Sequence, residues 1–291
     1  MSLKDEMVKL ARTAGGSFKT RSDRESIAGR FADHLKNDLN IQIKLVDQIK
    51  IAHVEKFVEH RLNEGISKRT MQNEMASVRS VLREAGRDQI LTQERLTNKS
   101  LGIDGACREG TKTALPEERY REFIRKAEER DVGVACAIGL GRELGLRAEE
   151  SAQSFKSLQT WNRQLASGEK KLTVVFGTKT GRSREIFVHD SCRERVVNAI
   201  KNALAISAKN GGSLIDKPNL KTAMDKLHNE VRAVGMKGKE SFHSLRYAFA
   251  QQQIKGYIEK GYSYKESLSL TSQDLGHGDG RGHYIQHVYS R

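Results

Sequence analysis

The chain is 291 residues long, with 37% hydrophobic and 30% charged residues, which is typical of a globular protein with one large domain or two ordinary ones. Its apolar runs are too short to span a bilayer, its charged N-terminal segment has no signal-peptide core, and its three cysteines form no CxxC pair. We therefore expect a protein of the reducing cytoplasm, and the net charge of +14 indicates a polyanionic partner such as nucleic acid.

Residues 20–98 have the hydrophobic pattern of a small helical bundle. Three apolar stripes at helical spacing cover residues 27–35, 51–62 and 71–82, and glycines follow the last two stripes, where helices commonly end. Cations lie between the apolar positions, so one side of the bundle is basic. We expect four of these cations to bind the phosphates of a nucleic acid: Lys68, Arg69, Arg79 and Arg83.

The remaining residues indicate a second, larger domain. Residues 99–113 have no periodicity and several small residues, which is typical of a linker. After it come helical patterns and two β-like segments, KLTVVFG and REIFVH, which flank a glycine-containing hairpin loop. The predicted fold is mainly α with a small antiparallel β-sheet. Its predicted parts are a tail (1–19), a helical domain (20–98), a linker (99–113) and a mixed domain (114–291).

Two motifs of the larger domain carry cations. ELGLRAEES places Arg147 three residues before Glu150, so on a helix the carboxylate orients the guanidinium. TKTG places Lys179 at the tip of the predicted hairpin, where a lysine can act as a mobile proton donor. Taken alone, each pattern is more often an ordinary surface feature.

Two further motifs carry histidines. SFHSLRYAFA places His243 and Arg246 on one face of an otherwise apolar helix, and a buried arginine is costly unless it is paired or binds an anion. DLGHGDGRGHYIQHVYSR contains His277, a glycine-rich stretch, Tyr284 and Tyr289. A single histidine or tyrosine of this kind is usually a packing residue.

Taken in order, from about residue 20 to the end, these motifs resemble those of the tyrosine recombinase (phage integrase) family. HSLRYAFA and DLGHGD are the most specific parts of the resemblance. It implies a two-domain architecture, with a helical SAM-like core-binding domain and an α/β catalytic domain. In this family a tyrosine hydroxyl attacks a DNA phosphodiester, which gives a 3′-phosphotyrosyl intermediate and a free 5′-hydroxyl. The resemblance implies no metal, ATP or other cofactor.

The resemblance also implies roles at the phosphate. Arg147 and Arg246 would bind its non-bridging oxygens and stabilise the transition-state charge. His277 would hydrogen-bond the phosphate, and Glu150 would hold Arg147 without touching the DNA. The negative group that faces the arginine of HSLR would then be the scissile phosphate.

The remaining implied roles concern the nucleophile and its protons. Lys179 would protonate the leaving 5′-oxygen, and His243 would assist proton transfer at the nucleophile, since a free phenol has a pKa of about 10. The segment between the two histidine motifs is longer than usual, and neither tyrosine has the usual distance from His277. Tyr284 comes slightly early and Tyr289 a few residues late. HVYS resembles the family's nucleophile segment, so Tyr289 is favoured and Tyr284 is left open.

Three other functions compete with this interpretation. The first is a non-catalytic DNA-binding protein that retains the fold, and the second is a type IB topoisomerase, for which the chain is short. The third is a metal protein that uses His283 and His287, one helical turn apart, with His277 or Asp279 as a third ligand.

The expected partner is double-stranded DNA, which the two domains would clamp. We expect a homotetramer on paired recombination sites of an integrating element, in the cytoplasm and associated with the nucleoid. An accessory directionality or DNA-bending factor is left open. Because only two residues follow Tyr289, contacts between protomers are expected to differ from those made by a C-terminal helix.

Overall fold

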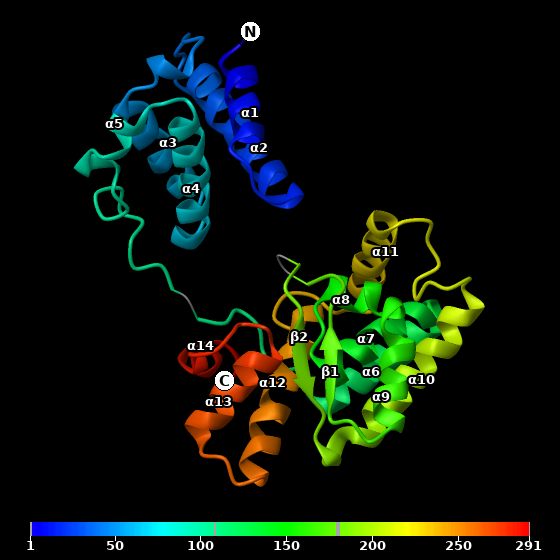
Figure 1. The fold of residues 1–291 in the computed structure, drawn as a ribbon. Helices are drawn as coiled ribbons and strands as arrows, with labels where there is room; N and C mark the ends of the chain where they lie inside the picture. Colours follow the sequence, from blue (N-terminus) through cyan, green and yellow to red (C-terminus); the bar gives the residue numbers. More distant parts are fainter. Residues whose placement is uncertain (1, 108, 179–180, 291) are drawn as a thin grey trace. The chain divides into compact units, whose positions relative to one another are not determined.

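The apolar stripes of the sequence form two separate cores. In the computed structural model, which describes residues 2–107, 109–178 and 181–290, the chain divides into two units, Met1–Arg108 and Glu109–Arg291 (Figure 1). Each unit encloses its own cluster of buried hydrophobic side chains. In the described residues the fold is mainly helical with one two-stranded antiparallel sheet, which confirms the predicted fold class. No described helix is long and apolar enough to cross a membrane.

The N-terminal unit is a helical bundle in which serines cap three of the helices. Ser2, Ser17 and Ser67 accept hydrogen bonds from backbone N–H groups of the first turns of α1, α2 and α4. A π-helical turn, His34–Asp38, continues α2. The α-helices are α1 (Leu3–Thr13), α2 (Phe18–Asp33), α3 (Ile51–Asn63), α4 (Lys68–Glu84) and the short α5 (Asp88–Leu91).

This unit extends beyond the predicted range of 20–98 at both ends. Helix α1 packs against α2 and α4 and buries Leu3, Met7 and Ala11. These residues recur every fourth position, so a segment expected to be a tail is a short amphipathic helix. At the other end, Ile103, which lies in the predicted linker, is buried in the same core, and its carbonyl accepts a hydrogen bond of 2.7 Å from Gln72 Nε2.

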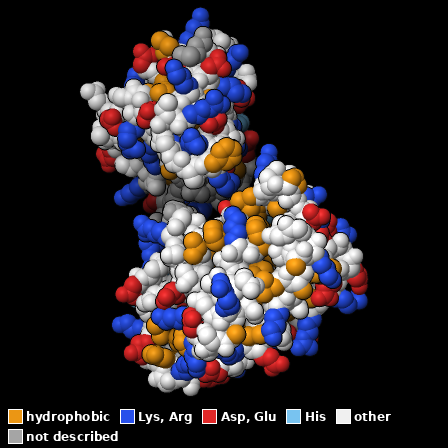
Figure 2. All heavy atoms as spheres, turned by 45° about the vertical axis from the view of Figure 1, so that its right-hand side comes forward, with side chains coloured by type: hydrophobic (Ala, Val, Ile, Leu, Met, Phe, Trp, Pro, Cys, Tyr) orange, Lys and Arg blue, Asp and Glu red, His pale blue; other side chains and the backbone are white. Residues whose placement is uncertain are grey.

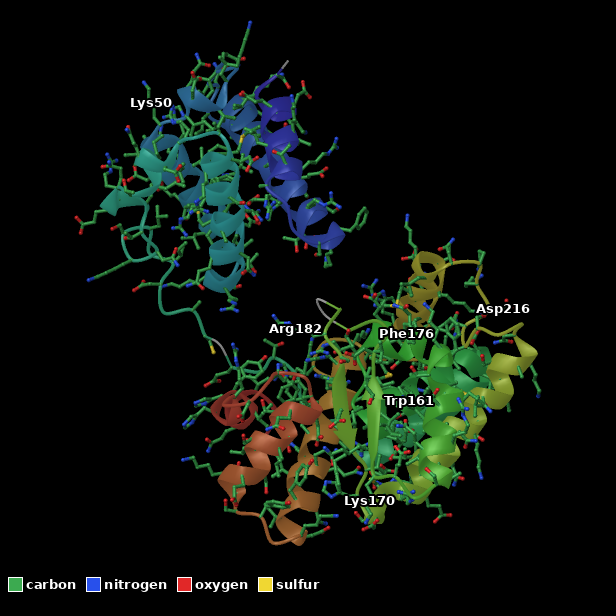
Figure 3. The ribbon with its side chains drawn as sticks, viewed as in Figure 1. Lys50, Trp161, Lys170, Phe176, Arg182 and Asp216 are labelled. Carbon is green, nitrogen blue, oxygen red and sulfur yellow. The ribbon has the colours of Figure 1, made fainter. Side chains whose placement is uncertain are left out.

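The C-terminal unit surrounds a two-stranded sheet with helices. Strand β1 (Lys171–Val174) pairs with β2 (Arg184–Phe187), with Lys171 opposite Phe187 and Val174 opposite Arg184. Trp161 lies in the core beside the sheet, and its indole N–H donates to the carbonyl of Thr173 (Figure 3). The helices are α6 (Glu117–Arg130), α7 (Val132–Leu144), α8 (Ala148–Gln153), α9 (Leu158–Ala166), α10 (Arg193–Lys209), α11 (Leu220–Ala233), α12 (Phe242–Glu259), α13 (Tyr264–Asp274) and α14 (Gly282–Tyr289).

Helix α12 is the central element of this unit. It packs against α7, α13 and α14, so most of its first three turns are buried on every side. Helix α7 ends at Gly145, whose φ of 57° is left-handed. A Cβ at this position would lie 2.3 Å from Cδ1 of Phe249 on α12. A glycine is therefore needed for the end of α7 to approach α12.

Candidate active site

The motifs identified in the sequence meet in a cleft of about 750 Å³ in the C-terminal unit. The cleft is lined by the residue that caps α8, the β1–β2 connection, the start of β2, α12, the end of α13 with the segment after it, and α14. Arg182, from the β1–β2 connection, adds a further positive charge (Figure 3). The candidate residues that line the cleft are Arg147, His243, His277, Tyr284 and Tyr289.

Arg147 and Glu150 form the predicted pair at the start of α8. Arg147 Nη1 donates to Glu150 Oε1 at 2.6 Å, and the Arg147 backbone N–H donates to Glu150 Oε2 at 2.8 Å. Burial favours protonation of Glu150, but the positive charges of Arg184 and Arg246 outweigh it and lower the pKa of this carboxyl to about 2. Glu150 is therefore ionised and holds Arg147, whose side chain is 26% exposed.

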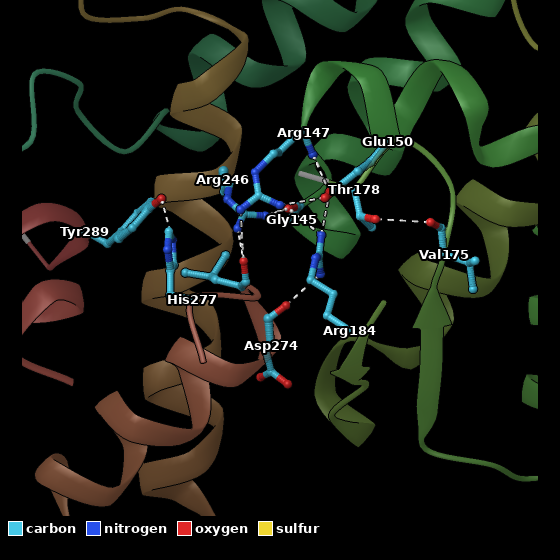
Figure 4. Close-up of polar contacts among 11 residues, drawn as sticks. Gly145, Arg147, Glu150, Val175, Thr178, Arg184, Arg246, Asp274, His277 and Tyr289 are labelled. Atoms are coloured by element: carbon cyan, nitrogen blue, oxygen red, sulfur yellow. Dashed lines mark hydrogen bonds and ion pairs between the residues drawn. The ribbon is translucent and has the colours of Figure 1, made fainter. Parts of the chain in front are cut away.

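Arg246 lies behind the cleft and is only 1% exposed. Its guanidinium donates to the backbone carbonyls of Gly145 and Leu275, and Arg147 Nη2 also points to Leu275 O, at 3.4 Å (Figure 4). Burial, together with Arg184 and Arg147, lowers the pKa of Arg246 to about 9, so it remains a cation at neutral pH. The buried arginine of the HSLR motif thus has backbone partners and a second guanidinium beside it.

His277 contacts the hydroxyl of Tyr289. His277 Nε2 lies 3.2 Å from Tyr289 Oη, and Tyr289 is 1% exposed. Burial, together with the charges of Arg246 and Arg147, lowers the pKa of His277 to about 3, so its ring is neutral at physiological pH. A neutral imidazole nitrogen can accept a hydrogen bond from the tyrosine hydroxyl.

Among the described residues, His243 makes no hydrogen bond to this hydroxyl. Its ring centroid is 6.1 Å from that of Tyr289, and burial together with Arg246 and Arg147 lowers its pKa to about 4. The expected role of His243 in proton transfer at the nucleophile is therefore not matched by a contact in this structure. Here the histidine at the hydroxyl is His277.

Tyr284 occupies the same helix and cleft as Tyr289. It is 40% exposed, and its ring centroid lies 4.9 Å from that of His277. Burial raises its pKa above the ordinary value for a phenol. The structure therefore brings both candidate tyrosines to one histidine, and the recorded hydroxyl contact belongs to Tyr289.

Lys179 lies outside the described residues. Thr178 and Arg182, which stand on either side of it in the sequence, line the cleft. The Thr178 hydroxyl donates to the carbonyl of Val175.

The predicted DNA-binding cations belong to α4 of the N-terminal unit. Lys68, Arg69 and Arg83 are exposed, and Arg83 lies 3.7 Å from Asp88. Arg79 differs, because its Nη2 donates to Leu96 O at 2.7 Å and to Asn98 Oδ1 at 2.9 Å. Burial also lowers the pKa of Arg79. Its guanidinium therefore holds the segment after α5, a structural contact that the sequence did not predict.

Sequence reasoning missed Arg184, the first residue of β2. Its side chain is buried and lies 2.7 Å from Glu150 Oε2. The available signal was strand alternation, which places Arg184 on the same buried face as Ile186. Among the described residues, the alternative metal ligands His283 and His287 are not gathered with a third ligand.

Comparisons with known proteins agree with this fold. A family model described as Integrase matches residues 102–252, and one described as Phage integrase, N-terminal matches residues 1–91. Among curated protein sequences there is no significant match. The N-terminal helical unit and the C-terminal mixed unit thus each match an integrase model, over nearly all of the first and over more than half of the second.

Several solved structures are similar to this chain. A Tn1549 transposon integrase in complex with transposon right end DNA is 16% identical, with a TM-score of 0.60 over 96% of this chain and 92% of that one. A lambda integrase dimer bound to a COC′ core site is 16% identical, with a TM-score of 0.62 over 98% and 76% of the two chains. A lambda integrase tetramer bound to a Holliday junction is 18% identical, with a TM-score of 0.61 over 97% and 75%. At these identities the likeness establishes the fold, and it confirms the predicted two-domain architecture.

Proposed function

Because the chain belongs to the tyrosine recombinase (phage integrase) family, we propose that it cleaves and rejoins DNA through a 3′-phosphotyrosyl intermediate with Tyr289 as the nucleophile. The observation that carries this proposal is the contact between His277 Nε2 and Tyr289 Oη in a cationic cleft. We assign the tyrosine hydroxyl as the nucleophile and the histidine beside it as its base. The family membership makes the chain a site-specific recombinase, and the residue roles that follow are our proposal.

The cleavage step conserves the energy of the broken bond. Tyr289 Oη forms a bond to phosphorus while the bond from phosphorus to the 5′-oxygen breaks. The tyrosine proton passes to His277 Nε2, and the leaving 5′-oxygen takes a proton from Lys179. A 5′-hydroxyl of a second strand then attacks the phosphotyrosine and releases the tyrosine. No bond energy is lost between the two steps, so neither requires ATP.

The charge of the site supports a phosphate as its ligand. Glu150 is one carboxylate among three guanidinium groups, so the site keeps an excess of positive charge. Arg147 reaches the cleft and would bind a non-bridging oxygen, while Arg246 would add its charge from behind. Fixed cations of this kind stabilise the negative charge that builds in a phosphoryl-transfer transition state.

The proposal extends to the partners of the protein. We propose that exposed Lys68, Arg69 and Arg83 of α4 bind the phosphates of the duplex. A homotetramer on paired sites, and a role in integrating or excising a mobile element, are proposed by analogy with the transposon integrase bound to transposon end DNA and the lambda integrase tetramer on a Holliday junction. Such analogy rests on the family rather than on a site in this chain.

Covalent trapping tests the mechanism. A nicked duplex from the junction of the element that encodes the protein would be incubated with the wild-type protein, Tyr289→Phe and Tyr284→Phe, with EDTA and without ATP. We expect an adduct, resolved on a denaturing gel, with wild type and Tyr284→Phe but not with Tyr289→Phe. Loss of the adduct only in Tyr284→Phe moves the nucleophile to Tyr284. If wild type binds the duplex and forms no adduct, the chain is a non-catalytic DNA-binding protein.

A further inference from the structure

A second buried arginine connects the parts of the candidate active site. Arg184 is the first residue of β2, and its side chain is 4% exposed. Its Nη1 donates to the carbonyl of Asp274 at 2.6 Å, and its Nη2 lies 2.7 Å from Glu150 Oε2 and 3.3 Å from the carbonyl of Gly145 (Figure 4). One side chain therefore contacts the end of α7, helix α8 and the end of α13.

The aliphatic stem of Arg184 also fixes the backbone beside His277. A Cβ on Gly276 would lie 2.6 Å from Arg184 Cδ, so the Gly276 backbone lies directly against the stem. Gly276 has a φ of 67° and immediately precedes His277. The position of the histidine that contacts Tyr289 thus depends on a turn that packs on Arg184.

Arg184 and Arg246 hold the same two stretches of backbone. Both donate to the carbonyl of Gly145, while their other backbone acceptors, Asp274 and Leu275, are neighbours in the chain. One arginine comes from β2 and the other from α12. Together they fasten the end of α7 to the segment that leads to His277.

Arg184 also stabilises the ionised form of Glu150, which is the form that binds the Arg147 guanidinium tightly. Glu150 Oε1 accepts from the guanidinium of Arg147, and Oε2 accepts from Arg184 and from the Arg147 backbone. Without Arg184, a fully buried carboxylate would lose its nearest buried counter-charge, and burial would favour its neutral form. A neutral Glu150 holds the Arg147 guanidinium less tightly.

We propose that Arg184 is a positioning residue for DNA cleavage, which keeps Glu150 charged beside Arg147 and joins the strand after the β1–β2 connection to the backbone that carries His277. This inference rests on the proposed function. Arg184 borders the cleft at the start of β2, but its side chain is only 4% exposed and its polar contacts are with Glu150, Gly145 and Asp274. It therefore acts through the residues that it holds. The competing explanation is a buried ion pair that only stabilises the fold. Because methionine is apolar and can fill much of the same space, Arg184→Met separates the two explanations.

Single-turnover cleavage tests the positioning role. Adduct formation would be followed at saturating protein for the full-length wild type, Arg184→Met, Arg184→Lys and a control, Arg195→Met. Arg195 pairs with the buried Glu143 outside the cleft, and its side chain is 54% exposed, so it controls for the loss of a guanidinium from a buried carboxylate. We expect Arg184→Met to slow cleavage by about 100-fold, as a displacement of about 1 Å does, with DNA affinity close to wild type. Arg184→Lys keeps the charge but lacks the fork, so its rate should lie between the two. The loss of a buried partner should lower Tm, so the rates are compared at a temperature at which every variant is folded.

A second readout does not depend on cleavage. Carbon-13 NMR of labelled glutamate side chains, with Glu150→Gln for assignment, would follow the titration of Glu150 while it faces Arg147, Arg184 and Arg246. We expect no titration between pH 5 and 8 in wild type, and a higher midpoint in Arg184→Met but not in Arg195→Met.

The outcomes distinguish this inference from the proposed function. An Arg184→Met rate within threefold of an active wild type overturns the inference and leaves the proposed function intact. An unchanged Glu150 titration also overturns the inference. A loss of rate that is fully explained by an equal loss of DNA binding or of folded protein overturns it as well. If wild type forms no adduct, the proposed function fails and the catalytic role of Arg184 fails with it.

Discussion

The two histidines of the cleft lie among guanidinium groups, and their pKa values predict how the rate of cleavage depends on pH. Burial and these charges lower the pKa of His277 to about 3 and that of His243 to about 4. A histidine accepts a proton only above its pKa, so the rate of cleavage falls as pH falls through that pKa. We expect the single-turnover rate of adduct formation to vary less than about threefold between pH 6 and 8, since His277 stays neutral throughout.

The control for this prediction is His277→Gln, which removes the proton acceptor. We expect it to slow cleavage by about 100-fold or more, in the range typical of a lost general base. A wild-type rate that falls about tenfold between pH 7.5 and 5.5, with a midpoint near 6.5, would point to an ordinary histidine pKa. That outcome would contradict the electrostatic description of the cleft.

At the residue scale, the sequence predicts contacts that are local and misses those that are not. The pairing of Arg147 with Glu150 is local, because Arg147 caps α8 and Glu150 lies three residues on, in the first turn of that helix. Arg184 has its partners 34 and 90 residues away, at Glu150 and Asp274, so no local pattern identifies it. The resemblance assigns proton transfer at the nucleophile to His243, whereas the histidine in contact with the Tyr289 hydroxyl is His277.

At the scale of elements, the junction between α7 and α12 depends on Gly145. An alanine there would carry a left-handed φ and would place its Cβ 2.3 Å from Phe249 Cδ1. Backbone strain of about 1–2 kcal/mol and overpacking of about 1–3 kcal/mol should together lower the free energy of unfolding by about 3 kcal/mol. Urea unfolding followed by tryptophan fluorescence measures this, because Trp161 is the only tryptophan of the chain and belongs to the C-terminal unit.

Gly168→Ala is the matched control for the junction. Gly168 also has a positive φ, of 90°, but no described atom lies within 4 Å of its Cβ position, so only the backbone strain applies. We expect it to cost about 1 kcal/mol. Equal losses in the two variants would show that close approach to Phe249 contributes nothing. Gly145→Ala should also slow cleavage, since the Gly145 carbonyl accepts from both buried arginines.

Elements with a clear hydrophobic period are predicted from sequence, but the short helix α1 is not. The stripes at residues 51–62 and 71–82 correspond to α3 and α4 within a few residues. Helix α1 was missed because its three buried residues gain their significance only when α2 and α4 cover them. The period-2 alternation of β1 and β2 sufficed for the sheet, because both strands bury one face.

At the scale of the whole molecule, the net charge of +14 predicts DNA binding that depends strongly on salt. Lys and Arg side chains are spread over the visible face of each unit (Figure 2). Net charge alone gives non-specific attraction, whereas phosphate contacts at fixed positions require cations on one surface. On α4, helical geometry places Lys68, Arg69 and Arg83 within an arc of about 100°. We therefore expect the cations of α4 to contribute more to DNA binding than an equal number of cations elsewhere on the protein.

Removing two of these cations tests that expectation. Lys68→Ala/Arg69→Ala should make the slope of log K against log salt shallower by about 2, since each lost phosphate contact contributes about 0.9. The loss of affinity should be similar for the junction duplex and for an unrelated duplex, because phosphate contacts carry no sequence information. Fluorescence anisotropy at several salt concentrations measures both quantities.

The matched control removes the same charge from another surface. Lys201 and Lys209 are exposed on α10 of the C-terminal unit, so Lys201→Ala/Lys209→Ala lowers the net charge equally. If α4 contacts the duplex, the control should leave the slope within about 0.5 of wild type, since it removes no phosphate contact. Equal changes in the two double variants would mean that the protein attracts DNA through its overall charge. The basic side of the N-terminal bundle would then have no special role in binding.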